Sequence, residues 1–260
     1  MMLRRTAVHV ALCSLLVVLA VPAATAQSSW SSLQARGIKL PKRWGVGVSY
    51  YNQTQPYEID TLSIGLPGWD PSLAYGLPVD NDTTSMHATF DYWLAPYLNV
   101  MAMAGEIDGE TAVQTSGLPL PLPIGDLTVD YGGFMYGAGL TLAGGWDKVF
   151  AALTAQYTNT DLDLADSSVD AWVLTPKVGL TFDALSVWVG AMYQNAEERH
   201  RGTYTIPPLG TVPFDVTLHE KEPWNYLLGV SVGLGEHWVL IGEGGFGDRD
   251  AYLVHLEYRW

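Results

Sequence analysis

Alternation of apolar and polar side chains constrains the fold of this chain more than any other feature. It is clearest in the last ten residues, AYLVHLEYRW, where Tyr252, Val254, Leu256, Tyr258 and Trp260 share one parity and Leu253, His255, Glu257 and Arg259 share the other. A β-strand directs successive side chains to opposite faces, so this pattern predicts a strand with one apolar face and one largely charged face. From Trp44 onward the repeating period is two, which predicts an all-β fold.

Ten segments carry this alternation, and their connections alternate in length. The segments are residues 44–51, 85–92, 97–105, 131–142, 149–157, 171–182, 186–194, 224–234, 238–246 and 251–260. Short turns are expected at 95–96, 144–147, 183–184 and 235–237, and long connections at 52–83, 108–128 and 197–222. The connection at 160–168 is intermediate in length, and the short turn at 247–249, which carries Arg249, is expected on the long-loop side. The pattern predicts an antiparallel barrel of about ten strands, with both termini on the side of the short turns.

The first 26 residues have the layout of a secretory signal peptide. Arg4 and Arg5 precede an apolar run over residues 7–21, and cleavage is expected after Ala26. The only cysteine, Cys13, lies in this segment, so disulfides are not expected to stabilise the exported chain. We expect a signal peptide over 1–26, a short periplasmic or plug segment over 27–43, and the barrel over 44–260.

Alternation alone does not say whether the apolar face points into the barrel or out of it. A soluble ligand-carrying barrel has the same period with an apolar interior. Four features favour an apolar exterior: a small or polar opposite face, an even strand count in an exported chain without cysteine, short turns on one side only, and aromatic residues at strand ends. The aromatic residues expected at the membrane interface on the short-turn side are Trp44, Tyr92, Trp146, Phe182, Trp188 and Trp238, together with Trp260. The sequence therefore predicts a transmembrane barrel in contact with outer-membrane lipid and lipopolysaccharide.

The closing segment YLVHLEYRW resembles the C-terminal insertion signal of Gram-negative outer-membrane β-barrel proteins. The resemblance rests on Tyr252, Val254, Leu256, Tyr258 and the terminal aromatic Trp260, although phenylalanine is the more common last residue in that family. It implies short periplasmic turns, long extracellular loops and recognition of the last strand by the barrel-assembly machinery. It implies no activity and no cofactor.

Charged residues on the inward parity predict a polar network inside the barrel. The expected members are His87, Asp91, Lys177, Glu243, His255, Glu257 and Arg259. Eight-stranded barrels are filled by their own side chains, whereas 16 to 18 strands leave a water channel, so ten strands lie near the filled end. These residues either pair to satisfy a buried polar core or line a narrow pore that selects small solutes.

Most of the 27 acidic residues fall in the connections on the long-loop side, and the whole chain has a formal net charge of −14. An acidic surface excludes nucleic acid as a partner and would concentrate cations, including divalent cations, at the outer mouth. Three functions remain open: passage of small solutes or cations, a loop-mediated adhesin or interaction protein, and a hydrolase at the rim. The hydrolase hypothesis rests on the expectation that Glu198, His200, Thr217 and His219 point toward the cavity mouth.

Overall fold

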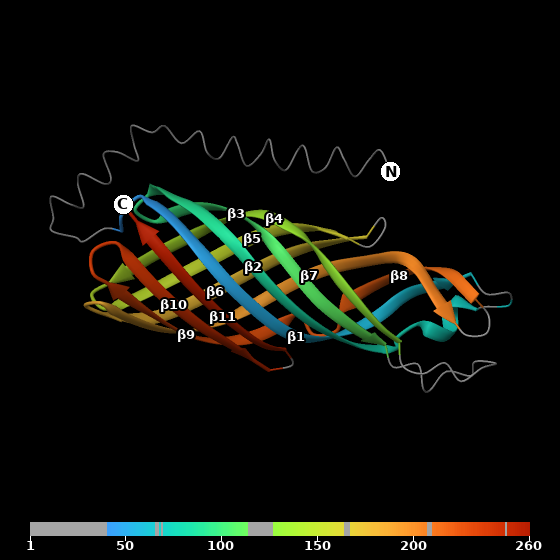
Figure 1. Cartoon of the computed structure of the whole chain (residues 1–260). Coiled ribbons are helices and arrows are strands. Elements are labelled where there is room, and N and C mark those ends of the chain that lie inside the picture. Colours follow the sequence, from blue (N-terminus) through green and yellow to red (C-terminus); the bar gives the residue numbers. More distant parts are fainter. Residues whose placement is uncertain are drawn as a thin grey trace.

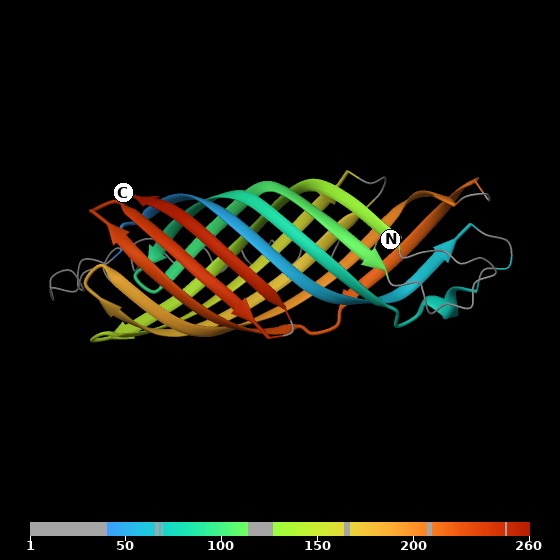
Figure 2. The same ribbon diagram turned by 60° about the horizontal axis from the view of Figure 1, so that its bottom comes forward.

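The computed structural model is a closed, tilted β-barrel (Figures 1 and 2). It describes residues 41–65, 68, 70–113, 127–163, 167–206, 210–247 and 249–260. The expected signal peptide over 1–26, and almost all of the segment over 27–43, therefore lie outside the described residues. Within the described part of the chain, no helix is long and apolar enough to cross a membrane.

Eleven strands and one short 3₁₀ helix make up the described structure. They are β1 (Trp44–Ile64), η1 (Pro71–Ala74), β2 (Pro78–Ala95), β3 (Leu98–Val113), β4 (Leu127–Trp146), β5 (Val149–Leu162), β6 (Ser168–Phe182), β7 (Leu185–Ile206), β8 (Gly210–Glu220), β9 (Trp224–Leu234), β10 (Trp238–Phe246) and β11 (Asp250–Arg259). All strand pairs are antiparallel.

The barrel has ten strands in its inner section and eight in its outer section. In the inner section β1–β7 are followed by β9, β10 and β11, and β11 pairs back with β1. β8 and β9 lie one after the other along β7. In the outer section β8 pairs with both β7 and β1. It therefore takes the place that β9, β10 and β11 occupy in the inner section. In Figures 1 and 2, β1, β7 and β8 accordingly run on past the ends of β9, β10 and β11.

Much of what the sequence suggested as long connections is strand. β1 continues to Ile64, β2 begins at Pro78, and the expected connection over 197–222 contains the outer part of β7 and all of β8. These segments do alternate, as in YEIDTLSI, but their outward residues are polar because they lie beyond the apolar belt. The ring of ten strands, the short turns on one side and the antiparallel order agree with the sequence prediction.

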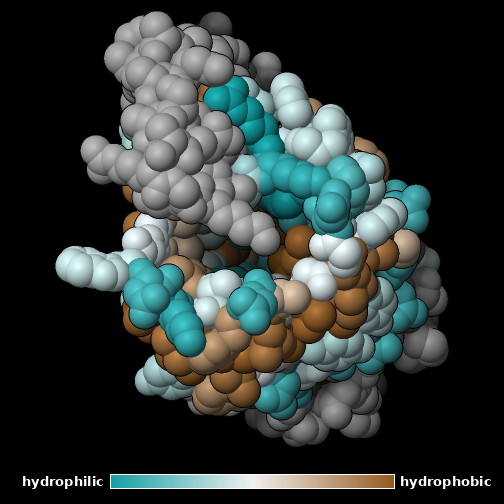
Figure 3. Space-filling view, turned by 90° about the vertical axis from the view of Figure 1, so that its left-hand side faces the viewer, coloured by the Kyte–Doolittle hydropathy of each residue, from teal (hydrophilic) through white to brown (hydrophobic). Residues whose placement is uncertain are grey.

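The barrel wall carries its apolar side chains on the outer surface and its polar side chains inside, which is the reverse of a soluble protein. On β1, Val48 is 47% exposed on the outer surface, whereas the next residue, Ser49, is 3% exposed inside. The same alternation continues around the ring, and Figure 3, which views the short-turn end, shows hydrophobic residues over much of the wall. Such a surface is stable only in hydrocarbon, so the chain is an outer-membrane β-barrel protein, with its short turns in the periplasm.

Two belts of outward aromatic residues bound the membrane-spanning section. The inner belt contains Trp44, Tyr92, Trp146, Phe182, Trp238, Tyr258 and Trp260, and the outer belt contains Tyr50, Tyr157, Trp172, Tyr193, Trp224, Tyr226, Phe246 and Tyr252. On β6, Trp172 and Phe182 are ten residues apart. At about 3.3 Å per residue and a tilt of roughly 40°, this separation spans about 25 Å of hydrocarbon.

Trp188 does not belong to either belt, so its expected place at the membrane interface is wrong. It is 8% exposed and its indole points into the lumen. The reason is its parity, because Val187 and Val189 occupy the outward positions beside it. Gly229 on β9 makes room for the ring, since a Cβ there would lie 2.1 Å from Trp188 Cε2.

Trp260 closes the barrel at the inner belt. Its N–H donates to the carbonyl of Trp44 at 3.1 Å, and its own carbonyl accepts from Trp44 N at 3.3 Å. We expect Trp260→Asp to lower the amount of folded, heat-modifiable protein in the outer membrane, because a charge replaces an interface anchor of the last strand. Trp238→Asp, at the same belt on β10, is the matched control. Equal amounts of folded protein in both variants and the wild type would contradict an insertion role for Trp260.

Candidate functional site in the barrel interior

The interior of the membrane-spanning section contains stacked layers of polar side chains. The layer nearest the periplasm is centred on Arg259. Its Nη2 lies 2.7 Å from Asp91 Oδ1, and its Nε lies 2.8 Å from Glu257 Oε2. Asn99 also donates to Asp91. Gly45 is required beside this layer, because a Cβ there would lie 2.0 Å from Asp91 Oδ2. One guanidinium thus holds two buried carboxylates together.

Two histidines occupy the next part of the lumen. His255 Nδ1 lies 2.8 Å from Ser49 Oγ. A Cβ at Gly47 would come within 2.5 Å of the His255 ring, and one at Gly105 would come within 2.5 Å of His87 Cβ. The His255 imidazole therefore lies against Gly47 on β1, whereas Gly105 on β3 leaves room for the backbone and Cβ of His87. Glycine at the inward position 47 thus leaves the space that the His255 ring fills.

Lys177 and Glu243 form the second ionic layer. Lys177 Nζ lies 2.5 Å from Glu243 Oε2, and Trp188 Nε1 donates to the same oxygen at 2.7 Å. The Lys177 ammonium also lies 5.4 Å from the centroid of the Trp188 ring, within cation–π range. The structure thus brings all seven residues of the expected network to the lumen, in three groups. Trp188 joins them, although its aromatic type suggested an interface residue.

Arg249 lies where the ring narrows from ten strands to eight. Sequence reasoning placed it on the exposed outer side, but its exposed fraction is 0%. Its Nη1 donates to Gln194 Oε1 at 2.7 Å and to Gln55 Oε1 at 3.3 Å. The short turn between β10 and β11 therefore places its arginine under β8 and links β1 with β7. A charged residue at a turn is usually exposed, so the sequence pattern does not predict that Arg249 is buried.

A second polar cluster lies just beyond the outer aromatic belt. His200 Nε2 lies 3.2 Å from Glu198 Oε2, and both side chains are at most 6% exposed. Asn81 donates to Glu198 at 3.4 Å and accepts from Tyr131 at 2.9 Å. Burial, and after it the charge of Glu198, raises the pKa of Tyr57 and of Tyr131 above the usual value, so both phenols stay neutral donors.

The four residues expected at the cavity mouth do not come together. Glu198 and His200 point inward, but Thr217 and His219 point outward, and His219 Nδ1 lies 2.9 Å from Asp60 Oδ1 on the outer surface. Inward residues are odd-numbered on β9 and even-numbered on β8, because the parity changes across residues 221–223. Pro223 lacks the N–H that a continuous strand would donate there. The expectation for Thr217 and His219 was therefore wrong, because the inward parity of β9 does not continue into β8.

An apolar cap covers the buried Glu198–His200 pair on the outer side. It consists of Tyr57, Ile59, Leu62, Ala74, Val79, Val113 and Leu218, all at most 8% exposed. These residues come from β1, β2, β3, β8 and η1. The connection after β1 folds back to complete the cap, with Gly76 N donating to Ile59 O at 3.0 Å. The interior is thus polar at membrane depth and in the Glu198–His200 cluster, and the apolar cap covers that cluster on its outer side.

The outer wall above the membrane carries an acidic collar. We use this name for Asp80, Asp82, Glu106, Asp108, Glu110, Asp130, Asp161 and Asp163, all exposed on β2–β5 or directly after β5. Asp82, Glu110 and Asp130 are direct cross-strand neighbours. The described residues of these four outer strand segments include no lysine or arginine. Like charges in register repel, so the collar is a region of strong negative potential.

The opposite side of the outer section carries basic residues as well as acidic ones. Arg199 and Arg201 both contact Asp215, at 3.0 and 2.8 Å. Hydrogen bonds from Arg199 are the main reason that the pKa of Asp215 is lowered. Lys221 Nζ lies 3.1 Å from Glu58 Oε1. The basic residues of the outer section are therefore paired on β1, β7 and β8, away from the collar.

Comparison with protein-family models and with curated proteins finds no match. Among solved structures, the chain is similar to the outer-membrane protease OmpT from Escherichia coli, with 6% identity, a TM-score of 0.46, and coverage of 86% of this chain and 99% of that one. It is also similar to the outer-membrane protein OprG from Pseudomonas aeruginosa, with 14% identity, a TM-score of 0.43, and 85% and 98% coverage. The translocator domain of the autotransporter NalP from Neisseria meningitidis gives 10% identity, a TM-score of 0.41, and 90% and 97% coverage. These values carry no activity over to this chain.

Proposed function

We propose that this protein is a filled outer-membrane barrel whose activity lies on its outer section, as an interaction protein for cationic partners. The observation that carries the proposal is the sequence of layers across the lumen. Ionic groups around Arg259 and Lys177, the Arg249 contacts and the apolar cap follow one another along the barrel axis. A lumen packed in this way opposes free diffusion of solutes.

The acidic collar gives the proposed interaction its chemistry. Seven of its eight carboxylates stand on strands beyond the membrane, Asp163 directly follows β5, and the described basic residues of the outer section are paired elsewhere. A field of one sign raises the local concentration of counter-ions and of positively charged partners. Divalent cations and cationic polypeptides are therefore the partners that this surface suits.

Binding of polylysine to the protein in lipid nanodiscs tests this role. We expect a variant with Asp82→Asn, Glu110→Gln and Asp130→Asn to bind roughly tenfold more weakly, at about 0.5 kcal/mol for each exposed charge contact. Binding by the wild type should also weaken as salt screens the collar.

The matched control removes three charges at the periplasmic end, with Asp147→Asn, Asp183→Asn and Glu236→Gln. Asp147 and Asp183 have positive φ values of 53° and 46°, a conformation that asparagine tolerates. This control should bind polylysine as the wild type does. Equal weakening in both triple variants would mean that net charge, and not the collar, governs binding.

Passage of small cations is the second candidate function. Its support is the excess of carboxylates in the two ionic layers, where Asp91, Glu257 and Glu243 face Arg259 and Lys177. A path that opened through these layers would prefer cations, because one negative charge remains in excess.

A further inference from the structure

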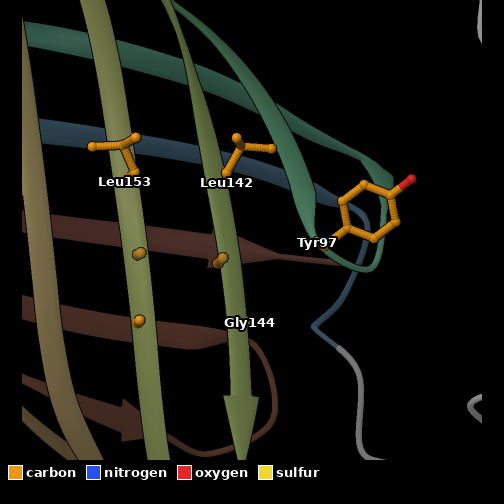
Figure 4. Close-up of a pocket in the computed structure, with 7 residues that line it drawn as sticks. Tyr97, Leu142, Gly144 and Leu153 are labelled. Atoms are coloured by element: carbon orange, nitrogen blue, oxygen red, sulfur yellow. The ribbon is translucent and has the colours of Figure 1, made fainter.

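An apolar hollow lies on the membrane-facing wall at the periplasmic end of the barrel (Figure 4). It has a volume of about 320 Å³ and is lined by Tyr97, Leu142, Ala143, Gly144, Ala151, Ala152 and Leu153. This volume is at the lower end of the roughly 300–1,000 Å³ of small-molecule sites. Leu142 and Leu153 are 46% and 39% exposed on the outward parity of β4 and β5, so the hollow opens toward the lipid and not toward the lumen.

The strand register explains why the wall is hollowed here. Leu142 pairs with Leu153, and the next outward pair toward the periplasm is Gly144 with Ala151. Two large side chains are thus followed by two positions with almost no side chain. A Cβ at Gly144 would meet no atom within 4 Å. Tyr97 forms a side wall, held in place because its carbonyl accepts from Ala143 N at 2.9 Å.

Polar groups stand at the periplasmic edge of the hollow. Trp146 follows Gly144 on the outward parity and is 88% exposed. The turn after it carries Asp147 and Lys148, both exposed, and Lys148 Nζ lies 5.6 Å from the centroid of the Phe182 ring. An interfacial tryptophan beside an anionic and a cationic group provides the contacts that a zwitterionic headgroup needs, below a hollow that suits a hydrocarbon chain.

We propose that this hollow binds one acyl chain of a phospholipid from the periplasmic leaflet, with its phosphate near Lys148 and its amine near Asp147. The occupant follows from the position of the hollow. The wall around it is apolar, lies within the inner aromatic belt and is covered by bilayer lipid, so a lipid chain is the material in contact with it. Bilayer lipid contacts the whole apolar wall, and the hollow gives one lipid chain a recessed site within it.

Native mass spectrometry of the detergent-solubilised full chain with added phosphatidylethanolamine tests the site. The wild type should retain one lipid per protein. Gly144→Leu fills the hollow and should weaken lipid retention roughly tenfold, as expected when about two methylene groups lose their apolar contact. Gly244→Leu is the matched control, because Gly244 also faces outward and a Cβ there would meet no atom within 4 Å. It should retain lipid like the wild type.

The headgroup contact is tested with Lys148→Gln, which should weaken retention while leaving the hollow intact. The same variants are compared with lipid A as the probe, and weaker retention of lipid A than of phosphatidylethanolamine is expected. The proposal is overturned if Gly144→Leu retains phosphatidylethanolamine like the wild type, if Gly244→Leu loses as much, or if lipid A is preferred. Heat modifiability on gels confirms that each variant is folded before it is compared.

Discussion

Replacement of Arg259 with methionine is expected to lower the stability of the barrel by about 3–5 kcal/mol, the usual cost of removing one partner from a buried ionic group. Arg259 is the cation that contacts both Asp91 and Glu257, which are 6% and 8% exposed. Without it, two carboxylates face each other in the lumen with no compensating charge. Urea unfolding of the barrel refolded into lipid vesicles measures the loss, independently of cellular assembly.

The triple variant Arg259→Met, Asp91→Asn, Glu257→Gln is the control for that experiment. It removes the guanidinium and both negative charges, so most of the lost stability should return. If Arg259→Met unfolds at the same urea concentration as the wild type, the Arg259 layer does not stabilise the lumen. If the triple variant is as unstable as the single one, packing of the arginine side chain, and not charge pairing, is the source of the effect.

Leu218→Ala is the second substitution with a large expected effect. Leu218 is 1% exposed in the apolar cap, and truncation of a buried leucine costs about 2–5 kcal/mol. Leu228→Ala changes the same residue type on β9, where the side chain is 58% exposed on the membrane-facing wall, and should cost much less. The effect of Leu218→Ala should appear first as faster proteolysis of the outer section. Equal protease resistance of the two variants would contradict a packed cap.

Alternation was sufficient to predict the membrane-spanning section from the sequence. On β1 and β11, apolar residues such as Val48 and Val254 point outward, and Ser49 and His255 meet inside, because a strand with one lipid-facing side must keep its parity. The count of ten strands followed from the ten alternating segments of the sequence. Closure of the ring leaves no strand edge unpaired.

The outer section was not predictable in the same way. Beyond the membrane, both faces of a strand contain polar residues, so β8 and the outer part of β7 looked like loops. The change of parity between β8 and β9 reversed the expected directions of Thr217 and His219. Arg249 and Trp188 were misplaced for another reason: a charged turn residue is usually exposed and a tryptophan near a strand end usually anchors in the interface, and tertiary contacts overrode both tendencies.

Conductance of the purified wild-type protein in a planar lipid bilayer tests the filled lumen most directly. The layers around Arg259, Lys177 and Arg249, with the apolar cap beyond them, predict either no current above the bare membrane or a small one that prefers cations. Any cation preference should weaken as rising salt screens the acidic collar. A large, steady and weakly selective conductance would contradict the filled lumen and show that these side chains leave an open aqueous pore.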